Sequence, residues 1–314
     1  MPDLINQTKL ICKTYNLFPS RQKGQHFLIN EDFIEKIIAA ADLKVNDAVL
    51  EVGPGLGILT EALIKKAKQV ISVELDQKLF NFLKVKFTGT SNLELVNQDI
   101  LKFNPATYKL SLPRRDLTAF CGTPPEAVAA FHKKYVAGKA NSYQIVANLP
   151  YNITSHFLRK FLTMENRPSA MTILVQKEVA QRICAQKGEM SLLSISVQFY
   201  GEPKIIDYVG KNNFWPKPEV DSAILKISEI RNQKSIDKFF GKEASEKNFW
   251  RLIHVGFSAK RKQLQNNLAA GLKIDRQKMK ETLVSLKLDP LVRAEALSIK
   301  DWLALAKKLN FYLN

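Results

Sequence analysis

Cysteine and histidine are scarce in this chain of 314 residues, which has only three cysteines and four histidines. Cys12, Cys121 and Cys184 are odd in number and far apart, so we expect reduced thiols of a cytosolic protein and no disulfide framework. The histidines form no HExxH or related cluster. These absences argue against a metal enzyme, and we expect no metal site.

Long apolar runs are also missing. No segment approaches the roughly 20 residues that a membrane-spanning helix requires, and residues 1–20 lack the apolar core of a secretion signal. We therefore expect a cytoplasmic protein without a membrane anchor, in which residues 1–20 form an N-terminal extension.

Negative charge is in deficit, because 47 lysines and arginines face 30 acidic residues and the formal net charge is +17. This balance favours a polyanionic partner, nucleic acid first and an anionic membrane second. A basic surface that only keeps the protein in solution is the alternative. Length and a hydrophobic content of 46% predict about two domains with substantial cores.

A glycine-rich turn follows the first strongly apolar segment. Residues 48–52 read as a short strand, and Gly53-Pro54-Gly55-Leu56-Gly57 precedes a helix that continues through Lys66. Strand, glycine turn and helix are typical of the nucleotide-binding start of a doubly wound sheet, where Gly53 and Gly55 let the backbone approach a ligand. The spacing is GxGxG rather than GxGxxG, which argues against a dinucleotide-dependent dehydrogenase.

Acidic residues stand at the ends of the next two predicted strands. The strand over 70–74 ends in Glu74, where a ribose diol needs an acceptor, and the strand over 93–96 is followed by Asp99, placed for an adenine edge. Either acid alone reads as a solvated strand end or a helix cap. Because the carboxyl ends of parallel strands meet at one edge, the series predicts a nucleoside-binding site.

The fourth strand ends in a distinctive group of residues. The apolar run over 143–149 breaks at Pro150, which lacks a backbone donor and ends the strand. The Asn148 amide and the Leu149 carbonyl then stand beside the Tyr151 ring, which suits a planar substrate with an amino group. An edge strand with Tyr151 as ordinary packing is the alternative, but the preceding strand ends favour a site.

The remaining chain predicts further elements. We expect a helix over 31–41 capped by Asn30, an elaborated crossover over 104–142 with a helix over 126–135, and strands over 171–175, 192–200, 204–209 and 223–227. Pro216 and Pro218 hold Phe214 in an extended loop, which predicts that its ring lies opposite Tyr151; a core phenylalanine is the alternative.

Beyond Ser228 the chain becomes helical and basic. Helices are expected over 247–257, 262–268, 276–286 and 299–309. The cations Lys260, Arg261 and Lys262 at a helix junction suit phosphate contacts. We expect two domains, residues 1–228 and residues 229–314, the second being an RNA-binding helical domain.

Eight segments spread over nearly the whole chain resemble the rRNA adenine dimethylase superfamily: GQHFL, EVGPGLGILT, VISVELD, NQDI, ANLPYNI, FWPKPEVDSAI, FSAKRKQLQNNL and RAEALS. The resemblance implies an α/β, Rossmann-like class I methyltransferase domain, with a doubly wound and mostly parallel sheet, and a small C-terminal all-helical domain. The implied cofactor is S-adenosyl-L-methionine, and its implied contacts are His26, Leu28, Gly53, Gly55, Glu74, Asp99 and Asn148. His26 stands where many members have asparagine.

The resemblance also implies the reaction. The protein would dimethylate the exocyclic amines of two adjacent adenines in a 3′-terminal hairpin of small-subunit (16S) rRNA. It would act as a monomer on the immature small ribosomal subunit. The target base would be flipped out and held between Tyr151 and Phe214, with Asn148, Leu149 and Pro150 completing the catalytic set and no metal required.

Two alternatives stay open. An Erm-type enzyme methylates a large-subunit rRNA adenine and shares these motifs, but the FSAKRKQLQNNL and RAEALS stretches favour the small-subunit branch. A non-catalytic nucleic-acid binder on the same fold is the second alternative. The complete GxGxG turn, Glu74, Asp99 and the NLPY sequence argue against it.

Overall fold

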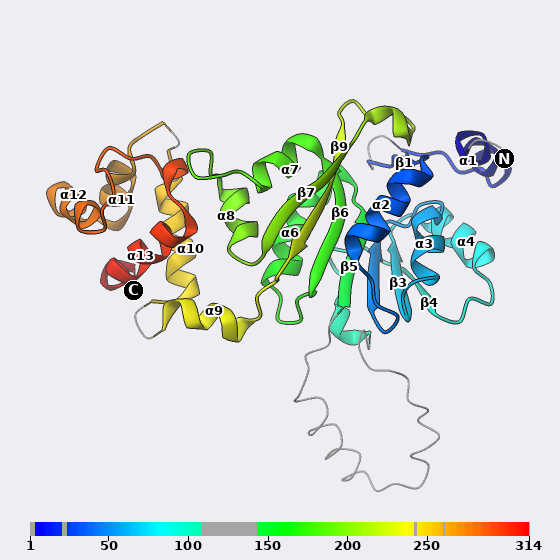
Figure 1. Cartoon of the computed structure of the whole chain (residues 1–314), viewed down its shortest axis with the longest axis horizontal. Helices are drawn as coiled ribbons and strands as arrows, with labels where there is room; N and C mark the ends of the chain where they lie inside the picture. Colours follow the sequence, from blue (N-terminus) through cyan, green and yellow to red (C-terminus); the bar gives the residue numbers. More distant parts are fainter. Residues whose placement is uncertain (1–3, 21–23, 109–142, 242–243, 260, 314) are drawn as a thin grey trace, which may run out of the picture. The chain divides into compact units, whose positions relative to one another are not determined.

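The computed structural model describes residues 4–20, 24–108, 143–241, 244–259 and 261–313 (Figure 1). The chain forms two compact units, one made of Met1–Lys177 and Ile205–Ser228, the other of Glu178–Lys204 and Glu229–Asn314. The helix predicted over 126–135 lies outside the described residues, as does most of the expected crossover. Within the described residues, no helix has the length and hydropathy needed to cross a membrane.

A seven-stranded sheet organises the first unit, in the order β4-β3-β2-β5-β6-β9-β7 (Figure 1). Its strands are β2 (Ala48–Val52), β3 (Gln69–Glu74), β4 (Leu93–Asn97), β5 (Tyr143–Asn148), β6 (Ala170–Gln176), β7 (Glu202–Val209) and β9 (Ser222–Ser228). β2 runs parallel to both β3 and β5, whereas β9 is antiparallel to β6. The strand order therefore reverses between β2 and β5, and a crevice forms outside the carboxyl ends of strands at such a point.

The helices of the first unit are α2 (Glu31–Ala41), α3 (Ile58–Ile64), α4 (Gln77–Lys86) and α6 (Thr154–Thr163). Crossovers between parallel strands are right-handed, which places α3 and α4 on one face of the sheet and α6 on the other. The predicted cap of α2 is confirmed, because the Asn30 side chain accepts a hydrogen bond from the Asp32 N–H at 2.9 Å. Ile34 and Ile37 of α2 are buried in the core with Val49 of β2.

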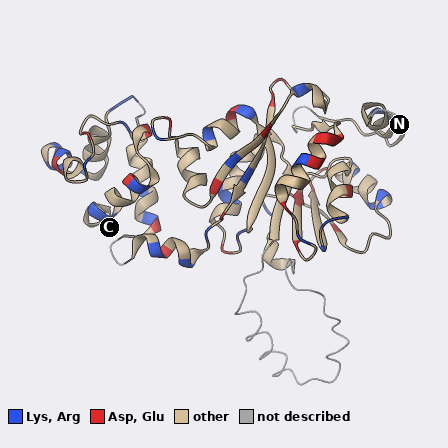
Figure 2. Ribbon diagram, viewed as in Figure 1, with Lys and Arg blue, Asp and Glu red and all other residues tan. Residues whose placement is uncertain are grey.

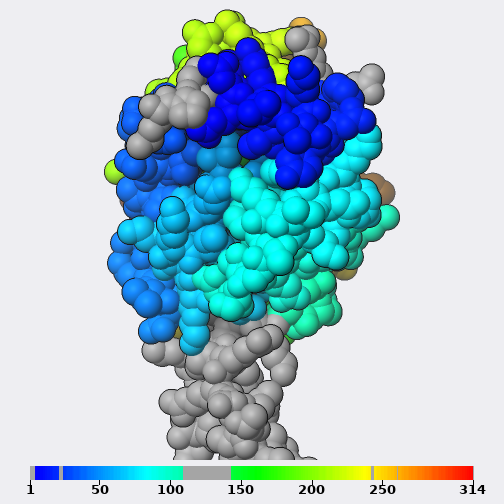
Figure 3. Space-filling view, turned by 90° about the vertical axis from the view of Figure 1, so that its right-hand side faces the viewer, coloured from blue at the N-terminus to red at the C-terminus, as the bar shows by residue number. Residues whose placement is uncertain are grey.

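The N-terminal segment is packed onto the first unit. Helix α1 (Leu4–Thr14) and the turn after it bury Cys12 and Leu17 in one apolar cluster with Phe82 of α4. The ring of Tyr15 meets the edge of the Phe82 ring at 4.8 Å. Figure 3 shows this dark-blue segment lying against the cyan part of the chain. Residues 4–17 therefore extend the core of the first unit.

A two-stranded ribbon joins two distant segments of the sequence. β1 (Phe27–Leu28) pairs antiparallel with β8 (Phe214–Trp215), and Leu28 faces Phe214 in the register. The ribbon therefore brings the GQHFL segment and the proline-spaced loop together beside the sheet.

The second unit is helical. It contains most of α7 (Lys177–Ile183), all of α8 (Leu192–Gln198), and α9 (Gln233–Phe240), α10 (Glu246–Gly256), α11 (Leu264–Leu272), α12 (Arg276–Ser285), α13 (Ile299–Lys308) and α14 (Asn310–Leu313). The sequence predictions missed α9.

The strand predicted over 192–200 is wrong, because this segment forms α8. Ser191 and Ser194 make a reciprocal capping box that starts the helix. At its end, the Phe199 ring stacks on the Phe249 ring of α10 at 4.7 Å and packs near Phe240. Packing within the second unit explains why residues 178–204 group with the C-terminal helices.

Candidate functional site

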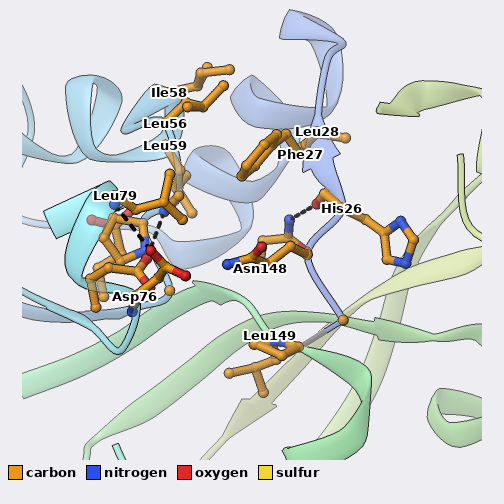
Figure 4. Close-up of a pocket in the computed structure, with 18 of the residues that line it drawn as sticks. His26, Phe27, Leu28, Leu56, Ile58, Leu59, Asp76, Leu79, Asn148 and Leu149 are labelled. Carbon is orange, nitrogen blue, oxygen red and sulfur yellow. Dashed lines mark hydrogen bonds between the residues drawn. The ribbon is translucent and has the colours of Figure 1, made fainter. Parts of the chain in front are cut away.

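A cavity lies at the carboxyl ends of β2, β3 and β5 (Figure 4). Most of the residues predicted for the site line it: His26, Leu28, Gly53, Gly55, Glu74, Asn148, Leu149, Pro150 and Tyr151. The structure therefore brings together three strand ends and the GQHFL segment, as the sequence predicted for a doubly wound sheet. Asp99 and Phe214 are not in its lining.

The glycine turn lines the cavity and contributes two positions without a side chain, Gly53 and Gly55. Gly55 has a positive φ of 57°, and a Cβ at this position would lie 2.9 Å from the Phe27 ring. Gly57, with a φ of 77°, would place a Cβ 2.6 Å from the Phe87 ring. Both positions are strained for any L side chain, so this turn requires glycine at each of them.

Glu74 ends β3 as predicted, and the residue is only 5% exposed. Its Oε2 accepts a hydrogen bond from the Gly55 N–H at 3.2 Å, and its Oε1 accepts one from the Asp76 N–H at 2.8 Å. Burial raises the pKa of this carboxyl to about 7, against the lowering effect of the two hydrogen bonds. Each oxygen keeps a second lone pair, so the group suits a pair of neighbouring hydroxyls.

Glu51 is a site residue that the sequence analysis missed. It lies within β2, is 1% exposed and lines the cavity. Its Oε2 accepts hydrogen bonds from Thr60 Oγ1 at 2.8 Å and Ser72 Oγ at 2.5 Å, while its Oε1 has no partner among the described residues. Burial raises the pKa of Glu51 to about 7. An acid in the otherwise apolar strand AVLEV was the available signal.

The Asn148 amide has a fixed orientation. Its Nδ2 donates a hydrogen bond to the His26 carbonyl oxygen at 2.9 Å, drawn as a dashed line in Figure 4. A carbonyl can only accept, so the amide nitrogen must face His26 and Oδ1 must point elsewhere as an acceptor. Beside it, the Leu149 N–H donates to the Leu174 carbonyl at 3.2 Å, which anchors the end of β5 to β6.

Tyr151 is held at both its hydroxyl and its ring. The hydroxyl lies 2.7 Å from Ser222 Oγ, and burial raises its pKa. The ring stacks with the His26 imidazole at a centroid distance of 5.8 Å and an interplanar angle of 23°. His26 Nδ1 lies 2.7 Å from the Pro216 carbonyl oxygen, which requires Nδ1 to carry the proton.

His26 acts on the cavity through its backbone. Figure 4 shows its ring pointing away from Asn148 and Leu149, while its carbonyl oxygen faces the Asn148 amide. The imidazole therefore lies on the Tyr151 side of the site.

Phe214 is not placed opposite Tyr151, contrary to the prediction for the proline-spaced loop. Its side chain is 2% exposed and packs in the core with Leu28 and Ile34. Pairing of β8 with β1 holds it there, because Phe214 is the register partner of Leu28. The prolines do extend the chain, but the ribbon turns this ring inward.

Asp99 follows β4, beside the end of β3. Its Oδ1 accepts a hydrogen bond from the Leu101 N–H at 2.8 Å, which closes a turn over residues 99–103. The side chain of Lys160 on α6 donates to two carbonyls of this turn, those of Ile100 and Phe103.

The predicted phosphate-binding cations lie between α10 and α11. Arg261 and Lys262 are exposed, and Lys260 is outside the described residues. The buried Asn267 side chain donates to the carbonyls of Gly256 at 2.7 Å and Ala259 at 3.1 Å. This asparagine therefore holds the segment that leads into the basic cluster.

The described residues contain no group of three or more histidine, cysteine or acidic side chains that could hold a metal ion.

The fold, the glycine turn, the acid at the end of β3 and the Asn-Leu-Pro-Tyr end of β5 define a Rossmann-like methyltransferase. A family model confirms and refines this class. The chain belongs to the ribosomal RNA adenine dimethylase family, whose model matches residues 19–310.

Similarity to individual proteins agrees with this family. The ribosomal RNA small subunit methyltransferase A of Dehalococcoides mccartyi (strain CBDB1) is 42% identical over 301 residues, 96% of this chain and 92% of that protein. A crystal structure of a dimethyladenosine transferase from Plasmodium falciparum has a TM-score of 0.69 and 26% identity, covering 91% of this chain and 98% of its own. The 23S rRNA methyltransferase ErmE, at a TM-score of 0.62 and 23% identity over 90% of this chain and 99% of its own, supports the fold alone.

Proposed function

We propose that this protein is an S-adenosylmethionine-dependent dimethyltransferase of adenines in small-subunit rRNA. The observation that carries the proposal is the end of β5, where the Asn148 amide is fixed with Oδ1 as an acceptor beside the held Tyr151 ring. The 42% identity to a small subunit methyltransferase favours that branch over the large-subunit alternative. The intact site also argues against a non-catalytic binder.

The residues of the cavity fit the proposed cofactor. Glu74 offers two carboxylate oxygens for the ribose hydroxyls, and the bare turn at Gly53 and Gly55 leaves room for the ligand. The unpartnered Oε1 of Glu51 suits the ammonium of the methionine part, because a buried acceptor without a donor is costly. Leu28 contributes an apolar side chain to the wall of the cavity. When bound, the cofactor supplies a methyl group activated by a sulfonium.

The chain's own contribution to transfer is positioning. The Asn148 Oδ1 and the Leu149 carbonyl would accept the two N–H groups of the target amine, which directs its lone pair toward the cofactor side. Tyr151 would stack on a base flipped out of its helix. Alignment of this kind is worth up to ~7–11 kcal/mol of the barrier. As the N–C bond forms, the nitrogen releases one of its two protons to solvent. It then still presents one N–H, so the same acceptors serve a second transfer.

The proposal also covers the finer features of the function. The target is a pair of adjacent adenines in a 3′-terminal hairpin of 16S rRNA, and the partner is the immature small subunit. The enzyme acts as a monomer in the cytoplasm, where subunits assemble. Arg261 and Lys262 are exposed, and the net charge of +17 supports a polyanionic partner. We assign phosphate contacts to these cations and to Lys260, in a helical RNA-binding domain over 229–314.

The decisive experiment maps methylated adenines in both ribosomal RNAs from cells with and without this protein. We expect a dimethylated adenine pair in small-subunit rRNA that is lost without the protein and restored by the wild type. Asn148→Ala should not restore it, and its single-turnover rate should fall by about 100-fold, because misplacement of the amine is costly. Asn81→Ala, at an exposed asparagine on α4, is the control.

Other outcomes separate the alternatives. Dimethylation found only in large-subunit rRNA would assign the chain to the Erm-type reaction. An unchanged methylation map, together with no transfer by the purified protein, would identify a non-catalytic binder. Wild-type rates for Asn148→Ala would contradict the mechanism itself.

A further inference from the structure

Lys160 links the helix that follows the Tyr151 turn to the turn that carries Asp99. It lies on α6, the helix that begins at Thr154 directly after the turn containing Tyr151. Its half-buried Nζ donates a hydrogen bond to the Ile100 carbonyl at 2.9 Å and another to the Phe103 carbonyl. Both carbonyls belong to the turn that follows β4 and carries Asp99.

The turn after β4 resembles the end of a short helix. The N–H groups of Lys102 and Phe103 donate to the Asp99 carbonyl at 2.9 and 3.0 Å. Phe103 is fully buried and its ring stacks on Tyr108 at 4.7 Å. Carbonyls at such an end attract cations. The Ile100 carbonyl already accepts a hydrogen bond from the Phe103 N–H at 3.3 Å, and the Lys160 ammonium adds one to this carbonyl and one to the Phe103 carbonyl.

Lys160 and Asp99 also interact through their charges. Burial lowers the pKa of Lys160, and the Asp99 carboxylate acts in the opposite direction. Asp99 keeps one oxygen on the Leu101 N–H at 2.8 Å, which fixes the rotation of its carboxylate. One ammonium therefore sets the position of the Asp99 turn relative to α6.

We propose that Lys160 is a positioning residue for cofactor recognition, holding the turn so that the second carboxylate oxygen of Asp99 accepts the exocyclic amine of the cofactor's adenine. The inference rests on the proposed function and on the sequence-based prediction that Asp99 meets the adenine edge of the cofactor. Lys160 itself touches main-chain oxygens and acts through Asp99. Lys160 would therefore help the cofactor site to prefer an adenine nucleoside over a nucleoside that carries oxygen in place of the amine.

Calorimetry with two ligands tests this role without measuring methyl transfer. The ligands are S-adenosylhomocysteine and S-inosylhomocysteine, which differ in the group that Asp99 would meet. We expect wild type to prefer the adenosyl ligand by about 10-fold or more, because the inosine oxygen leaves the acceptor unpaired. Lys160→Met should lose most of this preference, mainly through weaker adenosyl binding. Lys102→Met removes an exposed lysine of the same turn and should keep it.

A double-mutant cycle with Asp99→Ala distinguishes positioning from general damage. If Lys160 acts through Asp99, Lys160→Met should change the adenosyl affinity by less than about twofold in the Asp99→Ala background. Additive effects, or a full preference retained in Lys160→Met, would overturn the inference and leave the proposed function intact. No preference in wild type would instead remove the assignment of Asp99. If Lys160→Met fails to fold, Lys160→Gln, which keeps one donor, replaces it throughout the cycle.

Discussion

Two buried carboxyls dominate the electrostatics of the cavity at the level of single residues. Glu51 and Glu74 are both almost fully buried, and burial raises the pKa of each to about 7. The charge of Glu74 adds to the effect on Glu51. Removing a carboxylate from water is costly unless it is paired. A ligand that brings an ammonium and two hydroxyls would therefore offset the cost of burying these two carboxylates.

The sign of the resulting pH dependence follows from the direction of the pKa shift. The Glu51 carboxyl ionises near pH 4.5 when solvated and near pH 7 in the folded protein. Between these values the folded state binds more protons than the unfolded state, so its stability falls as pH rises. The full loss per group is on the order of 3 kcal/mol.

Glu51→Gln should therefore reduce the loss of stability between pH 5 and pH 8. Relative to wild type, the variant should gain on the order of 3 kcal/mol in unfolding free energy across this interval. Urea unfolding of the ligand-free protein at both pH values measures the gain. Glu94→Gln, at an exposed glutamate on β4, is the control. The same loss in Glu51→Gln as in wild type would show that Glu51 is not buried and protonated as described.

At the level of elements, the ribbon of β1 and β8 decides what Phe214 does. The Phe214 side chain packs into the core, while Trp215, its neighbour on β8, is half-buried and stacks with Phe27 at 6.5 Å. Adjacent residues on a strand face opposite ways, so a base stacked on Phe214 would require the ribbon to twist or open.

Phe214→Ala should accordingly destabilise the fold. Loss of a fully buried phenylalanine costs about 3–5 kcal/mol of unfolding free energy, and Trp215→Ala should cost clearly less. Chemical unfolding of both variants gives the comparison. A Phe214→Ala protein as stable as wild type but slow in methyl transfer would restore the interpretation that this ring stacks on the target base.

At the level of the whole molecule, the excess of 47 cations over 30 acids should appear as salt-dependent RNA affinity. Removing two phosphate contacts with Arg261→Ala and Lys262→Ala should make the log–log salt slope shallower by about 1.5. The cofactor affinity should stay unchanged, because these cations lie in the second unit and the cavity lies in the first.

The matched control makes the same change of charge within the same unit. Lys234→Ala with Lys238→Ala removes two exposed cations from α9 (Figure 2). If this pair lowers the slope as much as the Arg261 and Lys262 pair does, the effect is one of overall charge. The basic cluster would then have no specific role in binding RNA.

Local sequence determined the elements whose signals are local. The apolar run of β2 and the Asn30 cap with the apolar face of α2 were predicted with the bounds that the structure shows. The order of glycine turn, Glu74 and Asn148 along successive strands also predicted one shared edge, because parallel strands align their carboxyl ends. Hydrophobic period, caps and turn residues act within a few positions, so the chain displays them directly.

Tertiary structure decided the features that depend on distant partners. Ile195 and Val197 alternate with polar residues as in a strand, yet the capping box and packing of the second unit make this segment a helix. Phe214 is buried because a pairing with Leu28, nearly two hundred positions away in the chain, turns it inward. The unpartnered oxygen of Glu51 and the bridge from Lys160 to the Asp99 turn exist only once the sheet is assembled. Contacts between segments that are remote in sequence leave no local signal, because each half of such a contact is an ordinary residue until the fold brings them together.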